Sequence, residues 1–119
     1  MIFRGIAREF SLKDNGQYDT IGGFWDEISD SFGLERLRGL GYGWSDGKIH
    51  YAIGLKSGDI DGFNLEIDLP DDGWESVSGR TDDLQKIYDE IYLDGPLLYE
   101  IETFLENGDC HIEYIRKRG

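Results

Sequence analysis

The feature that most constrains this chain is a β-hairpin at its C-terminal end, closed by Asn107-Gly108. Asn-Gly between two runs of alternating hydrophobicity is the strongest short-range signal for a two-residue turn. Such a turn fixes the register: it predicts Glu102 opposite Glu113, with Glu100 opposite Ile115 on the same face. Carboxylates directly opposite each other repel. The sequence therefore predicts either a solvated hairpin face or a pocket suited to a cation or a proton.

The composition limits the functions that remain open. A chain of 119 residues with 39% hydrophobic residues predicts one folded domain over residues 1–119. Its formal net charge of −13 disfavours binding to nucleic acid phosphates, and no apolar stretch has membrane-spanning length. The single Cys110 cannot form an internal disulfide, which fits a reducing, cytoplasmic compartment. Zinc-ligand, calcium-loop, phosphate-loop and nucleophile-elbow motifs are missing from the sequence, so we expect no metal, cofactor or serine-type catalytic centre.

Hydrophobic periodicity predicts two helices among several strands. Strands are expected over residues 2–10, 40–45, 48–56, 63–69, 74–79 and both arms of the C-terminal hairpin. The first helix begins near Thr20 and the second is capped by Thr81. Their buried faces are predicted to comprise Ile21, Phe24, Trp25, Ile28 and Phe32 in the first helix, and Leu84, Ile87, Tyr88 and Ile91 in the second.

The two halves of the chain resemble each other. Residues 24–28 (FWDEI) match residues 87–91 (IYDEI), and the turn Asp46-Gly47 corresponds to Asn107-Gly108. Each half reads as strand, helix and hairpin, which indicates an internal duplication. We therefore predict an α+β fold of two βαββ repeats about a pseudo-two-fold axis, with both helices on one face of an antiparallel sheet. The opposite face would stay partly open and could bind a ligand.

The first hairpin adds aromatic residues to the candidate site. A two-residue turn at Asp46-Gly47 places Tyr42 opposite Tyr51 and Trp44 opposite Ile49, on one bulky face. Aromatic walls with a carboxylate suit a flat, lipophilic cation. Two alternatives stay open: these aromatic residues fill the core, and the glutamates lie on an exposed hairpin. The candidate ligand-binding residues are Glu100, Glu102, Glu113, Tyr42, Trp44, Tyr51 and Ile115.

Several segments in order resemble a known family. They are residues 24–28, Tyr42-Gly43 with Asp46-Gly47 and residues 50–55, residues 67–79, residues 84–91, and residues 99–101. Together they resemble the GyrI-like small-molecule-binding domain, the effector-binding domain of AraC-type and multidrug-responsive regulators. The resemblance implies two βαββ units that hold lipophilic, often cationic compounds between them, against aromatic side chains and a glutamate on the penultimate strand. That glutamate matches Glu100.

The resemblance also implies a class of function. We expect a stand-alone domain without a DNA-binding partner domain, which senses or sequesters a small molecule and does not catalyse its turnover; a homodimer is one form that it could take. Stand-alone members include drug-sequestering proteins, a gyrase-inhibiting group and hydrolases of reactive cyclopropane-containing compounds. One alternative is therefore a hydrolase in which Glu100 or Glu102 acts as general acid or base beside Tyr51. Another is an acidic module that inhibits a nucleic-acid-binding enzyme.

Overall fold

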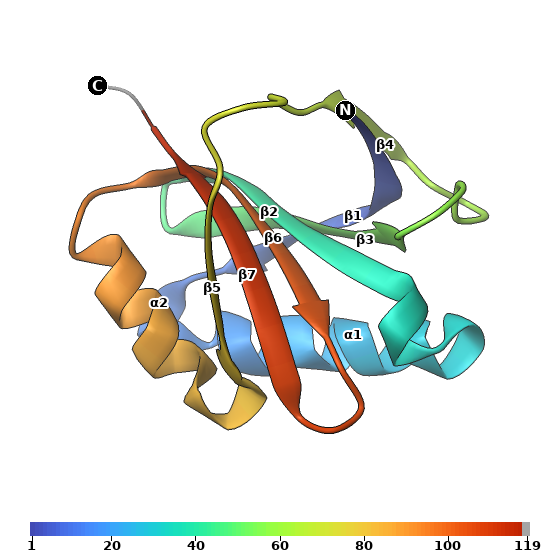
Figure 1. The fold of residues 1–119 in the computed structure, drawn as a ribbon, viewed down its shortest axis with the longest axis horizontal. Coiled ribbons are helices and arrows are strands. Elements are labelled where there is room, and N and C mark those ends of the chain that lie inside the picture. Colours follow the sequence, from blue (N-terminus) through green and yellow to red (C-terminus); the bar gives the residue numbers. More distant parts are fainter. Residues whose placement is uncertain (118–119) are drawn as a thin grey trace.

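The computed structural model describes residues 1–117 and shows an α+β fold. One seven-stranded sheet carries both helices on the same face (Figure 1). The strands are β1 (Ile2–Ser11), β2 (Leu37–Ser45), β3 (Lys48–Leu55), β4 (Leu65–Asp68), β5 (Glu75–Arg80), β6 (Leu97–Phe104) and β7 (Asp109–Arg116). The helices are α1 (Gln17–Phe32) and α2 (Leu84–Tyr92), the latter preceded by the 3-10 turn Thr81–Asp83.

The strand order is β4-β1-β3-β2-β6-β7-β5, and every pairing is antiparallel. The order β1-β3-β2 in the first half mirrors the order β6-β7-β5 in the second, and β2 pairs with β6 where the halves meet. Strand β4 extends the sheet beyond β1. That the two halves superpose as a structural repeat stays a prediction.

Both helices pack through the faces that periodicity predicts. Phe24, Trp25 and Ile28 of α1 join one core cluster with Tyr51 and Ile53 of β3. A second cluster forms under α2, where Tyr88 and Ile91 meet Leu97 and Ile112. Burial of these side chains contributes roughly 1.5–3 kcal/mol each and holds the helices against the sheet. The first helix begins at Gln17, earlier than predicted, and Gly33 (φ 86°) follows its last residue, a position that favours glycine.

The register of the C-terminal hairpin differs from the prediction by one residue. Glu102 pairs with Ile112 and Glu100 with Tyr114, whereas Glu113 pairs with Ile101. A slip of one residue moves every side chain of a strand to the other face of the sheet. The predicted contact between Glu102 and Glu113 is therefore wrong, because the two carboxylates lie on opposite faces.

The slip arises in the turn. The Leu105 N–H donates to the Asp109 carbonyl (2.9 Å), and the Gly108 N–H donates to the Leu105 carbonyl (3.0 Å). Residues 106–108 therefore form a three-residue loop with Gly108 at φ 92°. The loop takes one residue more than the predicted two-residue turn, which changes the pairing of both arms.

The first hairpin closes as predicted but carries an irregularity. Ser45 pairs with Lys48 across a two-residue turn, and a bulge then interrupts the ladder between Tyr42 and Ser45. Gly43 within this bulge has φ 64°. A bulge inserts one unpaired residue into its strand and shifts the pairing beyond it.

Beyond the bulge the predicted pairs are wrong. Tyr42 pairs with His50, and Gly41 pairs with Tyr51. Tyr42 and Tyr51 therefore lie on opposite faces of the sheet. Tyr51 points toward the helices and is 1% exposed, and Tyr42 packs on the far face, where its ring stacks on that of His50.

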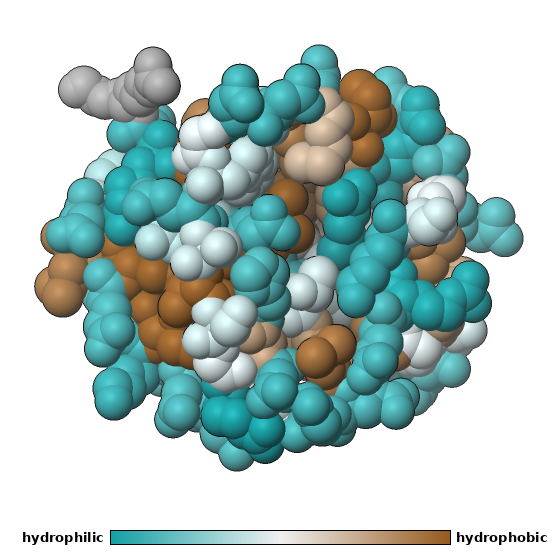
Figure 2. Space-filling view, viewed as in Figure 1, coloured by the Kyte–Doolittle hydropathy of each residue, from teal (hydrophilic) through white to brown (hydrophobic). Residues whose placement is uncertain are grey.

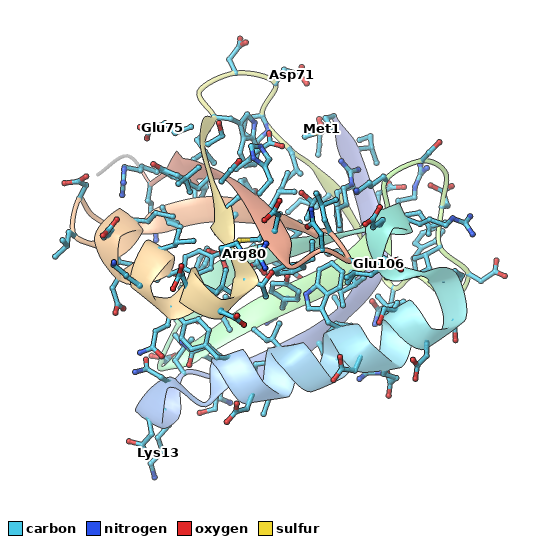
Figure 3. The ribbon with its side chains drawn as sticks, turned by 60° about the horizontal axis from the view of Figure 1, so that its bottom comes forward. Met1, Lys13, Asp71, Glu75, Arg80 and Glu106 are labelled. Atoms are coloured by element: carbon cyan, nitrogen blue, oxygen red, sulfur yellow. The ribbon has the colours of Figure 1, made fainter. Side chains whose placement is uncertain are left out.

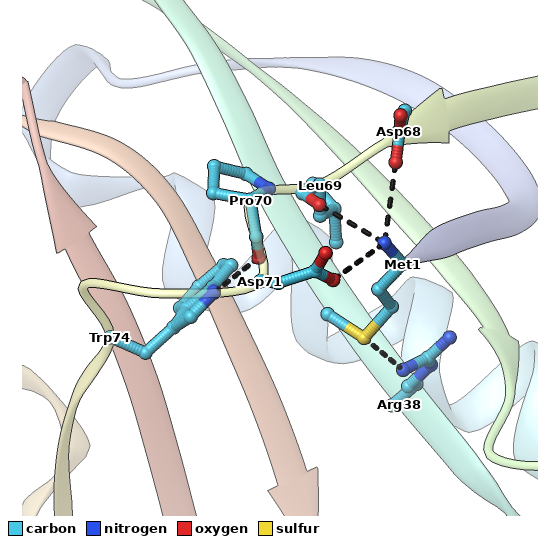
Figure 4. A network of polar contacts seen from close by, with 7 residues as sticks. All are labelled: Met1, Arg38, Asp68, Leu69, Pro70, Asp71 and Trp74. Carbon is cyan, nitrogen blue, oxygen red and sulfur yellow. Dashed lines mark hydrogen bonds and ion pairs between the residues drawn. The ribbon is translucent and has the colours of Figure 1, made fainter.

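The face away from the helices is partly covered by the connection through β4. Leu69 and Trp74 from this connection pack with Leu40 and Ile101 of the sheet. The covering segment is fixed by a polar network around the N-terminus (Figure 4). The Met1 amine donates to Asp68 (3.3 Å), Asp71 (3.0 Å) and the Leu69 carbonyl (3.2 Å), and the Trp74 indole donates to the Pro70 carbonyl (2.7 Å).

The visible surface of the molecule is mostly hydrophilic, with apolar side chains gathered on the side where α2 lies (Figure 2). Leu93, which follows α2, is 84% exposed. None of the helices formed by residues 1–117 is long and apolar enough to cross a membrane.

Candidate functional site

A cavity of about 630 Å³ opens between the two helices and the sheet face that they cover. This volume lies within the usual range of small-molecule sites. Figure 3 shows α1 along the lower edge of the view and α2 at its left, with Lys13 pointing outward from the 3-10 turn that precedes α1. The lining comprises Leu12, Gln17, Tyr18, Ile21, Gly22, Trp25, Asp26, Leu34, Tyr51, Thr81, Asp82, Leu84, Gln85, Tyr88, Tyr92, Glu100, Glu102, Phe104, Leu105 and Gly108.

Two buried carboxylates lie on the sheet side of this cavity. Glu100 and Glu102 are alternate residues of β6, so both point to the same face, and each is 4% exposed. Gly41 and Gly39 of β2 lie directly across from them. A Cβ at Gly41 would lie 2.6 Å from Glu100 Oε1, and one at Gly39 would overlap the Tyr51 hydroxyl. These two glycines therefore provide the room that the carboxylates and Tyr51 occupy.

Glu102 is held by two tyrosines. The Tyr51 hydroxyl donates to its Oε1, and the Tyr88 hydroxyl donates to its Oε2 at 2.7 Å. The Trp25 indole N–H in turn donates to the Tyr51 hydroxyl oxygen at 2.9 Å. Hydrogen bonds to a charged group typically contribute about 1.5–3 kcal/mol each. This network links α1, β3, β6 and α2 through one carboxylate.

The carboxyl group of Glu100 accepts weaker hydrogen bonding than that of Glu102. Among the described residues it accepts one hydrogen bond, from the Tyr92 hydroxyl to Oε2 at a long 3.4 Å. Burial, followed by the nearby charge of Glu102, raises the pKa of Glu100 well above its usual value, against the lowering effect of the Tyr88 and Tyr92 hydroxyls. Glu100 therefore retains its proton at pH values at which surface carboxylates are ionised.

Burial also raises the pKa of Glu102, but the hydrogen bonds from Tyr51 and Tyr88 oppose that shift. The tyrosine hydroxyls remain donors, because burial raises the pKa of each of them, that of Tyr18 to about 12. The two carboxylates titrate as an interacting pair in which Glu102 carries the negative charge more readily.

Aromatic side chains form the remaining walls. The Trp25 and Phe104 rings meet edge to face with centroids 4.9 Å apart, and the Tyr88 and Tyr92 rings stack at 5.7 Å. Aromatic faces attract cations, most strongly where water is excluded. The arrangement can accommodate a flat, apolar group and neutralise one positive charge at the buried carboxylates.

The structure brings three of the seven predicted site residues together. Glu100, Glu102 and Tyr51 line the cavity together. The remaining four candidates lie outside its lining: Tyr42, Glu113 and Ile115 are on the opposite face of the sheet, and Trp44 packs near the α2 cluster. The two register errors explain this division, since they move Tyr42 away from Tyr51 and Glu113 away from Glu102.

The sequence interpretation overlooked the aromatic walls contributed by the helices. Trp25 and Tyr88 were expected in the apolar helix faces, which they occupy, but both also line the cavity. Tyr18 lies one turn from Ile21, and Tyr92 lies one turn from Tyr88. An extension of each helical stripe by one turn would have found them.

Residues 1–117 contain no group of three or more His, Cys, Asp or Glu side chains placed to hold a metal ion. The cavity glutamates instead meet tyrosine hydroxyls.

Comparison with known proteins gives one similar fold. No family model and no curated protein matches the sequence. A solved structure of SAV2435 bound to tetraphenylphosphonium matches this chain with a TM-score of 0.60 and 16% sequence identity. The match covers 98% of this chain and 88% of that one. At this identity the similarity shows a shared fold.

Proposed function

We propose that this protein binds lipophilic, cationic small molecules in the cavity between α1 and α2, as a GyrI-like domain for sensing or sequestration. The observation that carries the proposal is Glu100, a buried carboxylate with one long hydrogen bond in a cavity walled by aromatic rings. Ionisation of a carboxyl group in such a place is costly, as the raised pKa of Glu100 shows, and a bound cation would offset that cost and favour the carboxylate. The similar fold of SAV2435, which was solved with the lipophilic cation tetraphenylphosphonium, supports this class of ligand.

The proposal predicts that Glu100→Gln weakens the binding of a cation but not that of a neutral compound of similar shape. We expect the variant to weaken tetraphenylphosphonium binding about ten- to a hundredfold, because a charged contact contributes roughly 1.5–3 kcal/mol. Binding of triphenylphosphine oxide, which is neutral, should change little. Isothermal titration calorimetry with both compounds gives the two affinities.

Glu113→Gln is the matched control. It makes the same change on the neighbouring strand, but on the opposite face of the sheet. We expect this variant to bind both compounds as the parent does. Equal losses for both compounds in Glu100→Gln would indicate a role in cavity shape, and no loss for either would place the site elsewhere.

A second candidate function is hydrolysis of reactive lipophilic compounds. It is favoured by the raised pKa of Glu100, since a protonated buried carboxyl is what a general acid requires. Incubation with lipophilic esters and cyclopropane-containing electrophiles, followed by mass spectrometry, distinguishes the two functions. Product formation that Glu100→Gln abolishes would establish an enzyme, whereas binding without product would support a ligand-binding domain alone.

A further inference from the structure

The two cavity carboxylates differ in how the protein holds them. Each oxygen of Glu102 accepts a tyrosine hydroxyl, from Tyr51 on β3 and from Tyr88 on α2. Glu100 accepts a long bond from Tyr92, and the Tyr88 hydroxyl, which donates to Glu102, also lies near enough to lower the pKa of Glu100. Both are equally buried, so the difference lies in their partners and not in their exposure. Two carboxylates on one strand, two residues apart, therefore differ in how firmly tyrosine hydroxyls hold them.

We propose that Glu102 is a positioning residue, whose carboxylate fixes the Tyr51 and Tyr88 side chains as cavity walls and leaves Glu100 as the group that meets the positive charge of the ligand. The inference rests on the proposed function and assigns separate roles within that site. It implies a ligand with one centre of positive charge directed at Glu100.

The surroundings of Glu100 make this division measurable. The titratable groups that face Glu100 come from every element around it: Glu102 on its own strand, Tyr51 on β3, Tyr88 and Tyr92 on α2, Tyr18 on α1, and Tyr114 directly opposite on β7. Glu102 is the carboxylate among these groups, and its charge is the second cause of the raised pKa of Glu100 after burial. Removal of that charge should allow Glu100 to ionise at lower pH.

Calorimetry with tetraphenylphosphonium and triphenylphosphine oxide at several pH values tests the assignment. We expect Glu102→Gln to retain the preference for the cation, while its curve of cation affinity against pH moves to lower pH. Glu100→Gln should lose the preference at every pH. If Glu102→Gln loses the preference as completely as Glu100→Gln, then Glu102 also meets the ligand charge and the proposal is wrong.

A ligand-free measurement separates this proposal from the proposed function. The ¹³C carboxyl resonance of Glu100 should titrate with a lower midpoint in Glu102→Gln than in the parent. An unmoved midpoint would overturn the coupling between the two carboxylates. A moved midpoint in a protein that binds neither compound would leave the coupling standing and refute the ligand-binding function.

Tyr88→Phe tests whether the bond to Glu102 fixes the Tyr88 side chain as a cavity wall, and it keeps both carboxylates. This variant removes one donor to Glu102 and leaves the ring in place. We expect about a threefold to tenfold loss of affinity for the neutral compound and at least that loss for the cation, because the Tyr88 hydroxyl also lowers the pKa of Glu100. A loss confined to the cation would contradict a role in shape and would place Tyr88 in charge recognition.

Discussion

At the scale of single residues, the site depends on two glycines as much as on its glutamates and aromatic residues. Gly39 and Gly41 face Glu102 and Glu100 across the β2–β6 ladder. Their positions let two carboxylates and Tyr51 occupy a layer that ordinary side chains would fill. The predicted register placed Tyr42 opposite Tyr51, and it therefore assigned Gly41 to the other face of the sheet.

Gly41→Ala should displace Glu100, because the added Cβ would lie 2.6 Å from Glu100 Oε1. We expect tetraphenylphosphonium affinity to fall about tenfold and stability to fall by roughly 1–3 kcal/mol, as for overpacked sites. Denaturant unfolding and calorimetry measure the two effects. Gly23→Ala is the control, since nothing lies within 4 Å of its Cβ and alanine favours helix by about 0.5–1 kcal/mol. Unchanged cation affinity in Gly41→Ala would contradict the placement of the ligand charge.

The pH dependence of stability follows from the raised pKa of Glu100. The native state binds more protons than the unfolded state between the usual glutamate pKa and the raised one, so its stability falls as pH rises through that window. Glu100→Gln cannot ionise, and it should become more stable than the parent by roughly 1–3 kcal/mol above the window. Thermal unfolding of both proteins across pH, with Glu113→Gln beside them, measures the difference. A constant difference across pH would contradict burial of an ionisable Glu100.

At the scale of elements, periodicity located the helices and most strand positions, because each buried face repeats with the period of its structure. The exact register of strand pairing could not be predicted from the sequence. The Asn107-Gly108 signal indicated a hairpin but not the three-residue loop, and the bulge near Gly43 has no strong sequence signature. Because strand side chains alternate, each small error moved Tyr42 or Glu113 to the wrong face. Three of the seven candidate residues, Tyr42, Glu113 and Ile115, therefore lie on the face opposite Glu100.

The bulge itself should tolerate substitution poorly. Gly43 has φ 64°, a conformation that side chains with a Cβ disfavour by about 1–2 kcal/mol, and a Cβ there would lie 2.8 Å from His50 Nδ1. We expect Gly43→Ala to lower unfolding free energy by more than Gly47→Ala, whose Cβ meets nothing within 4 Å at a similar φ of 73°. Urea unfolding ranks the two. Equal costs would show that the His50 contact does not constrain the bulge.

At the scale of the whole molecule, the cavity lies where the two halves of the chain meet. Trp25 and Tyr88 come from the matching segments 24–28 and 87–91, and both reach the hydrogen-bond network of Glu102. The family resemblance implied a ligand between the two halves, whereas the sequence repeat suggested the opposite, helix-free face of the sheet. The connection through β4 partly covers that face, and the cavity opens between the helices. The length of an irregular connection gives no indication of where it packs.

The location of the bound cation is the most direct test of the whole account. Nuclear Overhauser effects between the phenyl protons of tetraphenylphosphonium and the protein would locate it. We predict contacts to Tyr18, Trp25 and Phe104, whose side chains line the cavity beside Glu100. Contacts to Tyr42 and Trp74 instead would place the ligand on the opposite face of the sheet and contradict the assignment of the site.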